Sequence, residues 1–304
     1  DEICEIIITA INLDNQYVFS EVCILIETLT NFAYESLRPI LDGLVSALIK
    51  FCKYPEAIIC LECFLDKSDR PPASYNEIIN ALLSLINGQV PFPQDKYYAV
   101  IQCITNIIRN IHSTDENLYV ALRPFLNQVL QNNSESRLEV YRCFGYCTKI
   151  APRLIIEDIP LLANAMTQDL INRDDPDAYV YIAESVIEIV KIDPETFYPF
   201  APSFFQGFAS KISQISNIAD QNVENTEENE ELFFKVDQFQ RTCGQVLNCL
   251  STLFSAYPEE LGPQFNFILQ TISAFLVSDK PNFIIGSANS IANISPCLVS
   301  IGFQ

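Results

Sequence analysis

The sequence predicts an all-α protein built from stacked helix pairs, and three observations lead to this prediction. Apolar residues make up 49% of the 304 residues and charged residues only 18%, so the chain can bury a large core. Glycine occurs only 8 times, which argues against an all-β architecture with many tight turns. Apolar residues recur at helical spacing, and the helical segments return at a regular interval.

The segment 95–112 shows the helical period most clearly. Its apolar residues fall at i, i+3, i+4 and i+7, whereas alternation with period two would place half of them in water. In the segment 177–191, apolar residues face one way while Glu184, Glu188 and Lys191 face another. Helices that begin with polar or proline-containing turns are predicted over 55–65, 94–112, 135–150, 176–191, 232–256 and 281–293.

Prolines mark where other helices begin. Proline is tolerated in the first helical turn, because its missing N–H would have no partner within the helix there. The phrase Leu37-Arg38-Pro39 returns as Leu122-Arg123-Pro124, and we interpret both as the start of a second helix in repeats two apart. The prolines interpreted in this way are Pro39, Pro72, Pro124, Pro160, Pro202 and Pro263.

The first helices of the pairs begin near residues 55, 94, 135 and 177, at intervals of 39, 41 and 42. HEAT-type repeats have this period, at about 40 to 47 residues each. One amphipathic pair cannot bury its apolar face alone, so we predict a curved α-solenoid of about six to seven antiparallel helix pairs. A single-domain globular all-α fold is the alternative, but it does not predict a regular period. The approximate repeats are 18–53, 55–88, 94–131, 135–171, 176–216, 232–278 and an incomplete 281–304.

The two ends of the chain and its net charge indicate what kind of protein it belongs to and which classes of partner it can bind. The chain begins with Asp1 rather than Met, and both ends are apolar where a solenoid needs polar caps, so we expect a fragment of a longer array. A net charge of −20 repels nucleic-acid phosphates and anionic membranes and attracts basic proteins. We therefore expect no direct nucleic-acid binding, and asparagines with Pro296 in the uncharged stretch 281–304 argue against membrane insertion.

One interval breaks the period. From 177 to about 233 the chain runs 56 residues, and the excess contains an acidic segment, 219–231, without positive charge. A loop is expected there, because like charges repel one another and apolar anchors are missing. It is either a solvated linker or an electrostatic element that contacts a basic partner. Its acidic residues are Asp220, Glu224, Glu227, Glu228, Glu230 and Glu231.

Motifs for catalysis, metals or cofactors are missing from the sequence. The chain has one histidine, His112, and neither a zinc pattern nor a phosphate-binding glycine loop. Eleven cysteines form an odd set in apolar helical stretches, and Cys60 with Cys63 are interpreted as packed thiols, as are Cys143 and Cys147. We expect neither an enzyme nor a cofactor or metal site.

Two other local patterns have structural interpretations. Asp174-Asp175-Pro176-Asp177 could bind a cation, but an aspartate there is a natural N-cap for the helix that begins at Pro176. Asn132-Asn133-Ser134 and Asn293-Ile294-Ser295 match the glycosylation pattern, which we interpret as accidental without a secretory signal.

Phrases in the second half resemble the C-terminal half of the importin-β (karyopherin-β) family, nearest the class that imports ribosomal proteins and histones. An acidic insert precedes a helix that ends in Leu253-Phe254-Ser255-Ala256-Tyr257, and Leu261-Gly262-Pro263-Gln264-Phe265 is similar to the family's entry into the next helix. The resemblance covers 176–293, and 18–170 only as a generic repeat pattern. Asn289-Ser290 stand where the family often has an acidic pair, which puts any role of that pair in doubt.

This resemblance implies a cytoplasmic and nuclear transport receptor. Such a receptor would bind basic cargo on a concave face formed by second helices and release it to Ran-GTP, with nucleoporins as further partners. The alternative is a non-transport HEAT scaffold of a phosphatase, a vesicle coat or a chromosome-associated complex, and an enzyme is a distant third. The acids expected on or near second helices are Asp42, Glu77, Glu116, Asp158 and Asp169.

Overall fold

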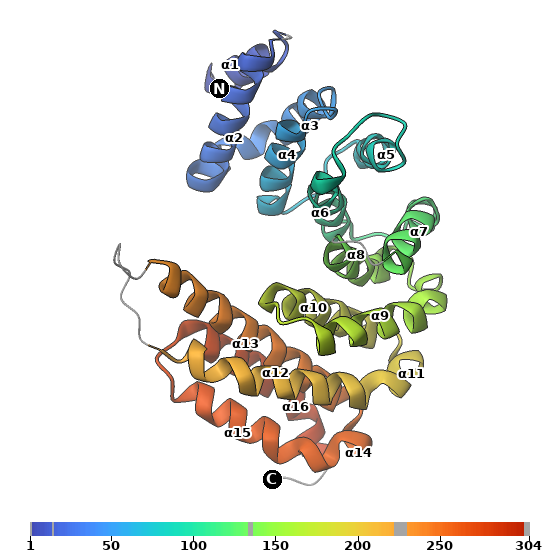
Figure 1. The fold of residues 1–304 in the computed structure, drawn as a ribbon, viewed down its shortest axis with the longest axis vertical. Coiled ribbons are helices and arrows are strands. Elements are labelled where there is room, and N and C mark those ends of the chain that lie inside the picture. The colour runs from blue at the N-terminus through green and yellow to red at the C-terminus, as the bar shows by residue number, and fades with distance from the viewer. Residues whose placement is uncertain (1, 14, 133–135, 222–229, 301–304) are drawn as a thin grey trace. The chain divides into compact units, whose positions relative to one another are not determined.

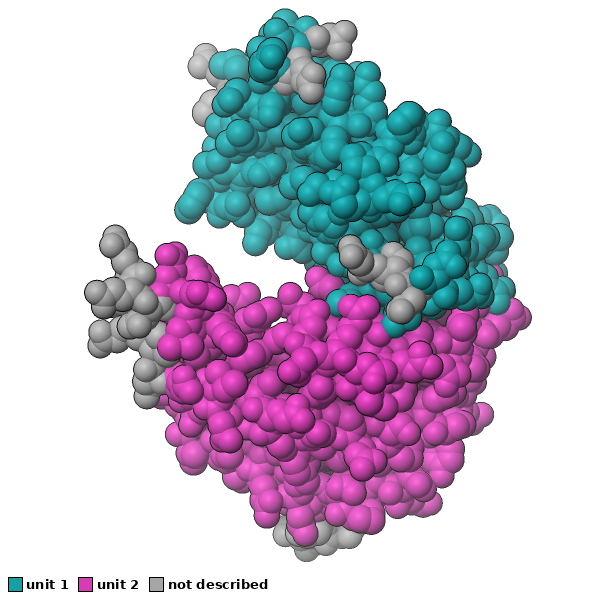
Figure 2. Space-filling model, viewed as in Figure 1, with its two compact units in different colours: residues 1–151 teal, residues 152–304 magenta. Residues whose placement is uncertain are grey.

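The protein is described from a computed structural model, which covers the chain except residues 1, 14, 133–135, 222–229 and 301–304 (Figure 1). Helices make up the regular structure of the described residues, and they follow one another in pairs. This confirms the predicted helical-repeat fold class. The chain divides into two compact units, residues 1–151 and 152–304, coloured teal and magenta in Figure 2.

Unit 1 consists of helix pairs arranged in two layers. The first helices α2, α4, α6 and α8 pack directly on one another in sequence, and the second helices α3, α5 and α7 cover them from one side (Figure 1). Its helices are α1 (Glu2–Ile11), α2 (Gln16–Leu37), η1 (Arg38–Ile40), α3 (Leu41–Ile49), α4 (Pro55–Lys67), α5 (Tyr75–Ile86), η2 (Gln94–Lys96), α6 (Tyr97–Arg109), α7 (Glu116–Gln131) and α8 (Arg137–Ile150).

Unit 2 repeats this plan with longer helices. Helix α13 packs between α10 and α16, while α12 packs on α9 and α13, and α15 packs on α16. Its helices are η3 (Ile155–Asp158), α9 (Ile159–Asn172), α10 (Pro176–Ile192), α11 (Pro194–Phe197), η4 (Tyr198–Phe200), α12 (Ala201–Ala219), α13 (Glu230–Ala256), α14 (Pro258–Leu261), η5 (Gly262–Gln264), α15 (Phe265–Leu276) and α16 (Pro281–Ser300).

Apolar side chains fill the space between the layers. In α6, Val100, Ile104 and Ile107 are at most 1% exposed, as the predicted apolar stripe requires. Buried thiols belong to the same core. Cys103 Sγ lies 3.5 Å from the Ile58 carbonyl oxygen of α4, so the thiol donates a weak hydrogen bond across the two first helices.

The contact between α13 and α16 is unusually close. Gly244 and Gly286 face one another at the crossing, and a Cβ added to Gly286 would stand 2.6 Å from the Gly244 Cα. Further along, Asn293 Nδ2 lies 2.9 Å from Asn248 Oδ1 and 3.0 Å from Ser251 Oγ, and it donates to them. These bonds satisfy a polar side chain in a helix interface. Asn293 lies within a helix and uses its amide internally, which agrees with the accidental interpretation of that glycosylation pattern.

Most of the prolines stand where the pattern predicts, but one does not. Pro39 lies in η1 directly before α3, and Pro160 lies at the start of α9. Pro124, by contrast, lies inside α7, which continues on both sides of it. The interpretation of Leu122-Arg123-Pro124 as a helix start is therefore wrong. At 37–39 the phrase runs from the last residue of α2 into η1, whereas at 122–124 it occupies the interior of α7.

Within the described part of the chain, no helix is both long enough and apolar enough to cross a membrane.

Candidate functional site: a groove in unit 2

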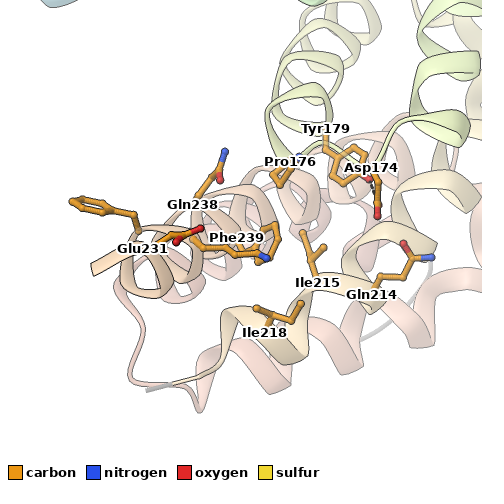
Figure 3. Close-up of a pocket in the computed structure, with 11 residues that line it drawn as sticks. Asp174, Pro176, Tyr179, Gln214, Ile215, Ile218, Glu231, Gln238 and Phe239 are labelled. Carbon is orange, nitrogen blue, oxygen red and sulfur yellow. Dashed lines mark hydrogen bonds between the residues drawn. The ribbon is translucent and has the colours of Figure 1, made fainter. Parts of the chain in front are cut away.

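A groove of about 960 Å³ opens in unit 2 where the start of α10, the end of α12 and the start of α13 meet (Figure 3). Side chains from all three helices surround it, because three helix ends converge there. The lining residues are Asp174, Pro176, Tyr179, Gln214, Ile215, Ile218, Glu231, Phe234, Lys235, Gln238 and Phe239.

The start of α10 forms one side of the groove. Asp175 is the N-cap, and its Oδ1 accepts a hydrogen bond from the backbone N–H of Asp177 at 3.0 Å. Pro176 takes an early helical position, where it loses no helical hydrogen bond. The predicted N-cap is thus confirmed. From α13, Gln238 Nε2 donates to Asp177 Oδ1 at 2.9 Å, which ties the two helix starts together.

Tyr179 and Lys211 make one end of the groove rigid. The Tyr179 hydroxyl lies 3.0 Å from both the Arg173 carbonyl oxygen and Asp174 Oδ1, so it donates its one proton to this pair of acceptors. Lys211 Nζ lies 5.1 Å from the centre of the Tyr179 ring, donates to the Arg173 carbonyl at 3.1 Å and lies 3.5 Å from Asp174 Oδ1. Burial raises the pKa of the Tyr179 phenol, so it stays a neutral donor at neutral pH.

The floor of the groove is apolar, and so is part of its rim. Ile215 and Phe239 are 7% and 8% exposed, whereas Phe234 is 57% exposed and Leu232 is 41% exposed on the first turns of α13. The Phe234 ring contacts the Phe233 ring, with their centroids 6.0 Å apart. Exposed large apolar side chains beside a groove are typical of a surface that binds another polypeptide.

Glu231 is the one acid of the predicted set among the lining residues of this groove, and two others stand on the adjoining helix ends. Glu230 and Glu231 form the first turn of α13, both are exposed, and Glu231 lines the groove. Asp220 follows α12 as its C-cap, and its Oδ1 accepts a hydrogen bond from Ser278 Oγ at 3.2 Å. The predicted acids that lie outside the described residues are Glu224, Glu227 and Glu228.

Three of the acids predicted on second helices are at the surface of unit 1. Asp42 has a structural function, because its carboxylate accepts from the Ala73 backbone N–H at 2.7 Å and from Arg70 Nη2 at 3.1 Å. The hydrogen bond from Ala73 is the main cause that lowers the pKa of Asp42. Glu77 and Glu116 are exposed in the first turns of α5 and α7, where a negative charge interacts favourably with the positive end of the helix dipole. None of these three acids is among the lining residues of the groove in unit 2.

The two remaining acids are buried. Asp158 is 5% exposed and Asp169 is 4% exposed. Asp169 Oδ1 lies 3.2 Å from Arg173 Nε, one helical turn further along the chain, and the ion pair compensates for its burial. The surface position expected for these two carboxylates is therefore not observed. An acid that pairs within its own helix cannot be distinguished from a surface acid by its spacing alone.

The two layers of helices pack differently in unit 1. There the first helices pack on one another closely, whereas the second helices contact one another little. The first helices carry acids that sequence reasoning missed, among them Glu27 of α2 and Glu62 and Asp66 of α4. Burial, and then the charge of Asp66, raises the pKa of Glu62 to about 7.

The thiols and carboxylates of the described residues do not gather into a metal centre. No group of three or more histidine, cysteine, aspartate or glutamate side chains lies close enough among them to hold a metal ion. Cys60 and Cys103 are buried on the first helices and are not oxidised to disulfides. A hydrogen bond with Cys23 and then burial raise the pKa of the Cys60 thiol, and burial raises the pKa of the Cys103 thiol, so both stay protonated at neutral pH.

The fold defines a helical-repeat protein. Neither a protein-family model nor a curated protein sequence matches this chain. Among solved structures, a crystal structure of importin-β is similar with a TM-score of 0.54 and 13% identity, over 98% of this chain and 44% of that one. Yeast importin-β (Kap95p) follows with a TM-score of 0.46 and 14% identity over 97% and 43%. An engineered protein has a TM-score of 0.48 and 13% identity over 96% and 78%.

This chain spans less than half the length of the importin-β chains that it matches, 44% in the first and 43% in the second. The likeness to importin-β shows a shared helical-repeat fold.

Proposed function

We propose that this chain binds basic proteins and belongs to a nuclear transport receptor of the importin-β type, present in cytoplasm and nucleus. It acts by binding rather than by catalysis, releases its cargo when Ran-GTP binds, and contacts nucleoporins in passage. A net charge of −20 on a helical-repeat surface supports this proposal, because such a surface attracts lysine- and arginine-rich segments over a distance of about one Debye length.

One observation carries the proposal. At the start of α13, the exposed carboxylates of Glu230 and Glu231 stand next to the exposed ring of Phe234 at the open side of a groove. Charge-assisted hydrogen bonds and apolar contact are thus offered to one extended peptide in one place. Lysine-rich cargo segments can make both kinds of contact, because the ammonium group donates hydrogen bonds and the long aliphatic stem packs on an aromatic ring.

The test is binding of a fluorescein-labelled, lysine-rich import-signal peptide to the full chain, followed by fluorescence anisotropy. We expect the affinity for the peptide to fall steeply between about 50 and 200 mM salt. When the whole receptor is used, we expect Ran-GTP to displace the peptide. The double variant Glu230→Gln/Glu231→Gln should weaken binding about threefold to tenfold. The matched control Glu5→Gln/Glu21→Gln makes the same charge change on exposed helical positions of unit 1 and should weaken binding less than twofold.

A scaffold without a transport role is the second candidate function. The exposed apolar side chains at the end of unit 2 favour it, since Val277, Ile285 and Ile291 are 88%, 59% and 42% exposed. Helix α16 carries no charged residue, which suits a permanent contact with another protein. Failure of the whole receptor to bind either the basic peptide or Ran-GTP would decide for the scaffold.

A further inference from the structure

A second hollow in unit 2, of about 660 Å³, lies away from the groove, at the turns between α10 and α11 and between α13 and α14. Its walls come from two consecutive repeats, so its shape depends on how the two turns stack. The lining residues are Pro194, Glu195, Tyr198, Ala256, Tyr257, Pro258, Glu259 and Glu260.

The two turns are built on the same sequence pattern. Each short helix begins with Pro-Glu, at Pro194-Glu195 and at Pro258-Glu259. Proline opens the helix without loss of a hydrogen bond, and the glutamate next to it favours the helix dipole. Four residues after the proline, the first turn has Tyr198 where the second has Gly262. The aromatic ring is therefore particular to one of the two turns.

Two tyrosine rings form the wall of this hollow, and hydrogen bonds hold each ring to the opposite turn. The Tyr257 hydroxyl donates to the Pro194 carbonyl oxygen at 2.8 Å, and the Tyr198 hydroxyl donates to Glu260 Oε2 at 3.2 Å. The ring centroids lie 5.8 Å apart at an interplanar angle of 62°. Tyr257 is 6% exposed and supports the wall, whereas Tyr198 is 49% exposed and presents its ring to solvent.

The charge of the hollow has one sign. Three exposed carboxylates, Glu195, Glu259 and Glu260, line it, and no lysine, arginine or histidine is among its lining residues. The negative charge of Glu260 and the hydrogen bond to it raise the pKa of Tyr198, which agrees with a negative potential at the ring. Aromatic faces and carboxylates attract the same kind of ligand, a cation.

We propose that this hollow binds a cationic side chain of a partner protein, an arginine guanidinium that lies on the Tyr198 ring and donates to the carboxylates of Glu259 and Glu195. A guanidinium is planar, can stack on a ring and offers several N–H donors in one plane, whereas an ammonium offers a compact point charge. This inference rests on the proposed function, because it takes the partner to be a basic protein. It adds one specific arginine contact at a site other than the groove.

The experiment measures anisotropy of two labelled peptides on the full chain, one of arginine and glycine and one of lysine and glycine in the same order. Wild type should bind the arginine peptide more tightly. We expect Tyr198→Ala to weaken that binding about threefold and Tyr198→Ala/Glu195→Gln/Glu259→Gln about tenfold. Tyr198→Phe keeps the ring and should stay within about twofold of wild type. Glu5→Gln/Glu21→Gln is the control for the effect of net negative charge on binding of a cationic peptide.

The outcomes separate this inference from the proposed function. Binding of the arginine peptide that the triple variant leaves unchanged overturns the inference and leaves the proposed function standing. If neither peptide binds wild type, both fail. Equal binding of both peptides overturns the guanidinium assignment, and a loss in Tyr198→Phe as large as in Tyr198→Ala overturns stacking. Should Tyr198→Ala not fold, Glu195→Gln/Glu259→Gln tests the carboxylates of the site on their own, because both residues are exposed.

Discussion

At the scale of single residues, two glycines decide whether α13 and α16 can meet. A Cβ on Gly286 would stand 2.6 Å from the Gly244 Cα and 3.0 Å from the Gly244 carbonyl oxygen, and backbone atoms cannot move aside as a flexible side chain can.

We predict that Gly286→Ala lowers the free energy of unfolding by about 2 to 4 kcal/mol, because the two helices must separate. Thermal unfolding followed by circular dichroism measures the effect. Gly262→Ala is the matched control, since nothing lies within 4 Å of its Cβ position and its φ of −48° suits alanine. A control that loses as much stability as Gly286→Ala would contradict the steric account.

Glu62 makes stability depend on pH. Its pKa rises from 4.5 to about 7 in the folded chain, because burial and the charges of Asp66 and Glu27 outweigh the opposing charge of Arg142. The folded state therefore holds a proton that the unfolded state loses, so this contribution is complete below about pH 4.5 and is lost as the pH rises to about 7.

We predict that Glu62→Gln is more stable than wild type by about 1 to 3 kcal/mol above pH 7, and that the difference disappears near pH 4.5. Urea unfolding across this range measures it, with the exposed Glu77→Gln as control. A difference independent of pH would assign the effect to packing.

Sequence reasoning reached some of these residues and not others. The cap at Asp175 was predictable, because an aspartate directly before a helix-starting proline has one common use. The burial of Asp158 and Asp169 was not, since their neighbours come from folding. The glycine pair was equally hidden, because Gly244 and Gly286 meet only when two helices 42 positions apart cross.

At the scale of elements, Pro124 is the exception among the prolines. It lies exposed inside α7, where it has no N–H to donate to the carbonyl of the preceding turn. Pro124 therefore removes one hydrogen bond from α7, whereas Pro160 at the start of α9 removes none, because an N–H at that position would have no partner within the helix.

Pro124→Ala should therefore raise the free energy of unfolding by about 1 to 3 kcal/mol, because it adds a helical hydrogen bond and loses no packing. Pro160→Ala is equally exposed and should change stability by less than about 0.5 kcal/mol. Chemical denaturation of both variants decides the matter. Equal effects would mean that proline position within the helix is unimportant here.

Helix positions followed from the period of apolar residues, and the predicted segment 135–150 is observed as Arg137–Ile150. The period does not tell which layer packs more closely, since both helices of a pair are amphipathic. The groove could not be predicted from the sequence either, because the apolar period does not show which apolar side chains stay exposed. Its rim includes Phe234, and an exposed phenylalanine looks like a core residue in the sequence.

At the scale of the whole molecule, like charges oppose the compact state. A net charge of −20 is spread over surfaces with few cations, and salt screens the resulting repulsion.

We predict that the melting temperature rises by about 2 to 5 °C between 10 and 300 mM NaCl at pH 7.5, because salt screens this repulsion. The rise should be smaller near pH 4.5, where protonated carboxylates leave less charge to screen. Equal salt effects at the two pH values would point to preferential exclusion of salt rather than to screening.

The buried thiols have a practical consequence. Buried cysteines without disulfides stand on the first helices α2, α4, α6, α8, α13 and α16, though not on α10, at Cys23, Cys60, Cys103, Cys143, Cys249 and Cys297. A thiol reagent reaches each of them only when its own helix pair opens. Labelling rates resolved by mass spectrometry would then read local stability repeat by repeat, with reporters that the chain already carries.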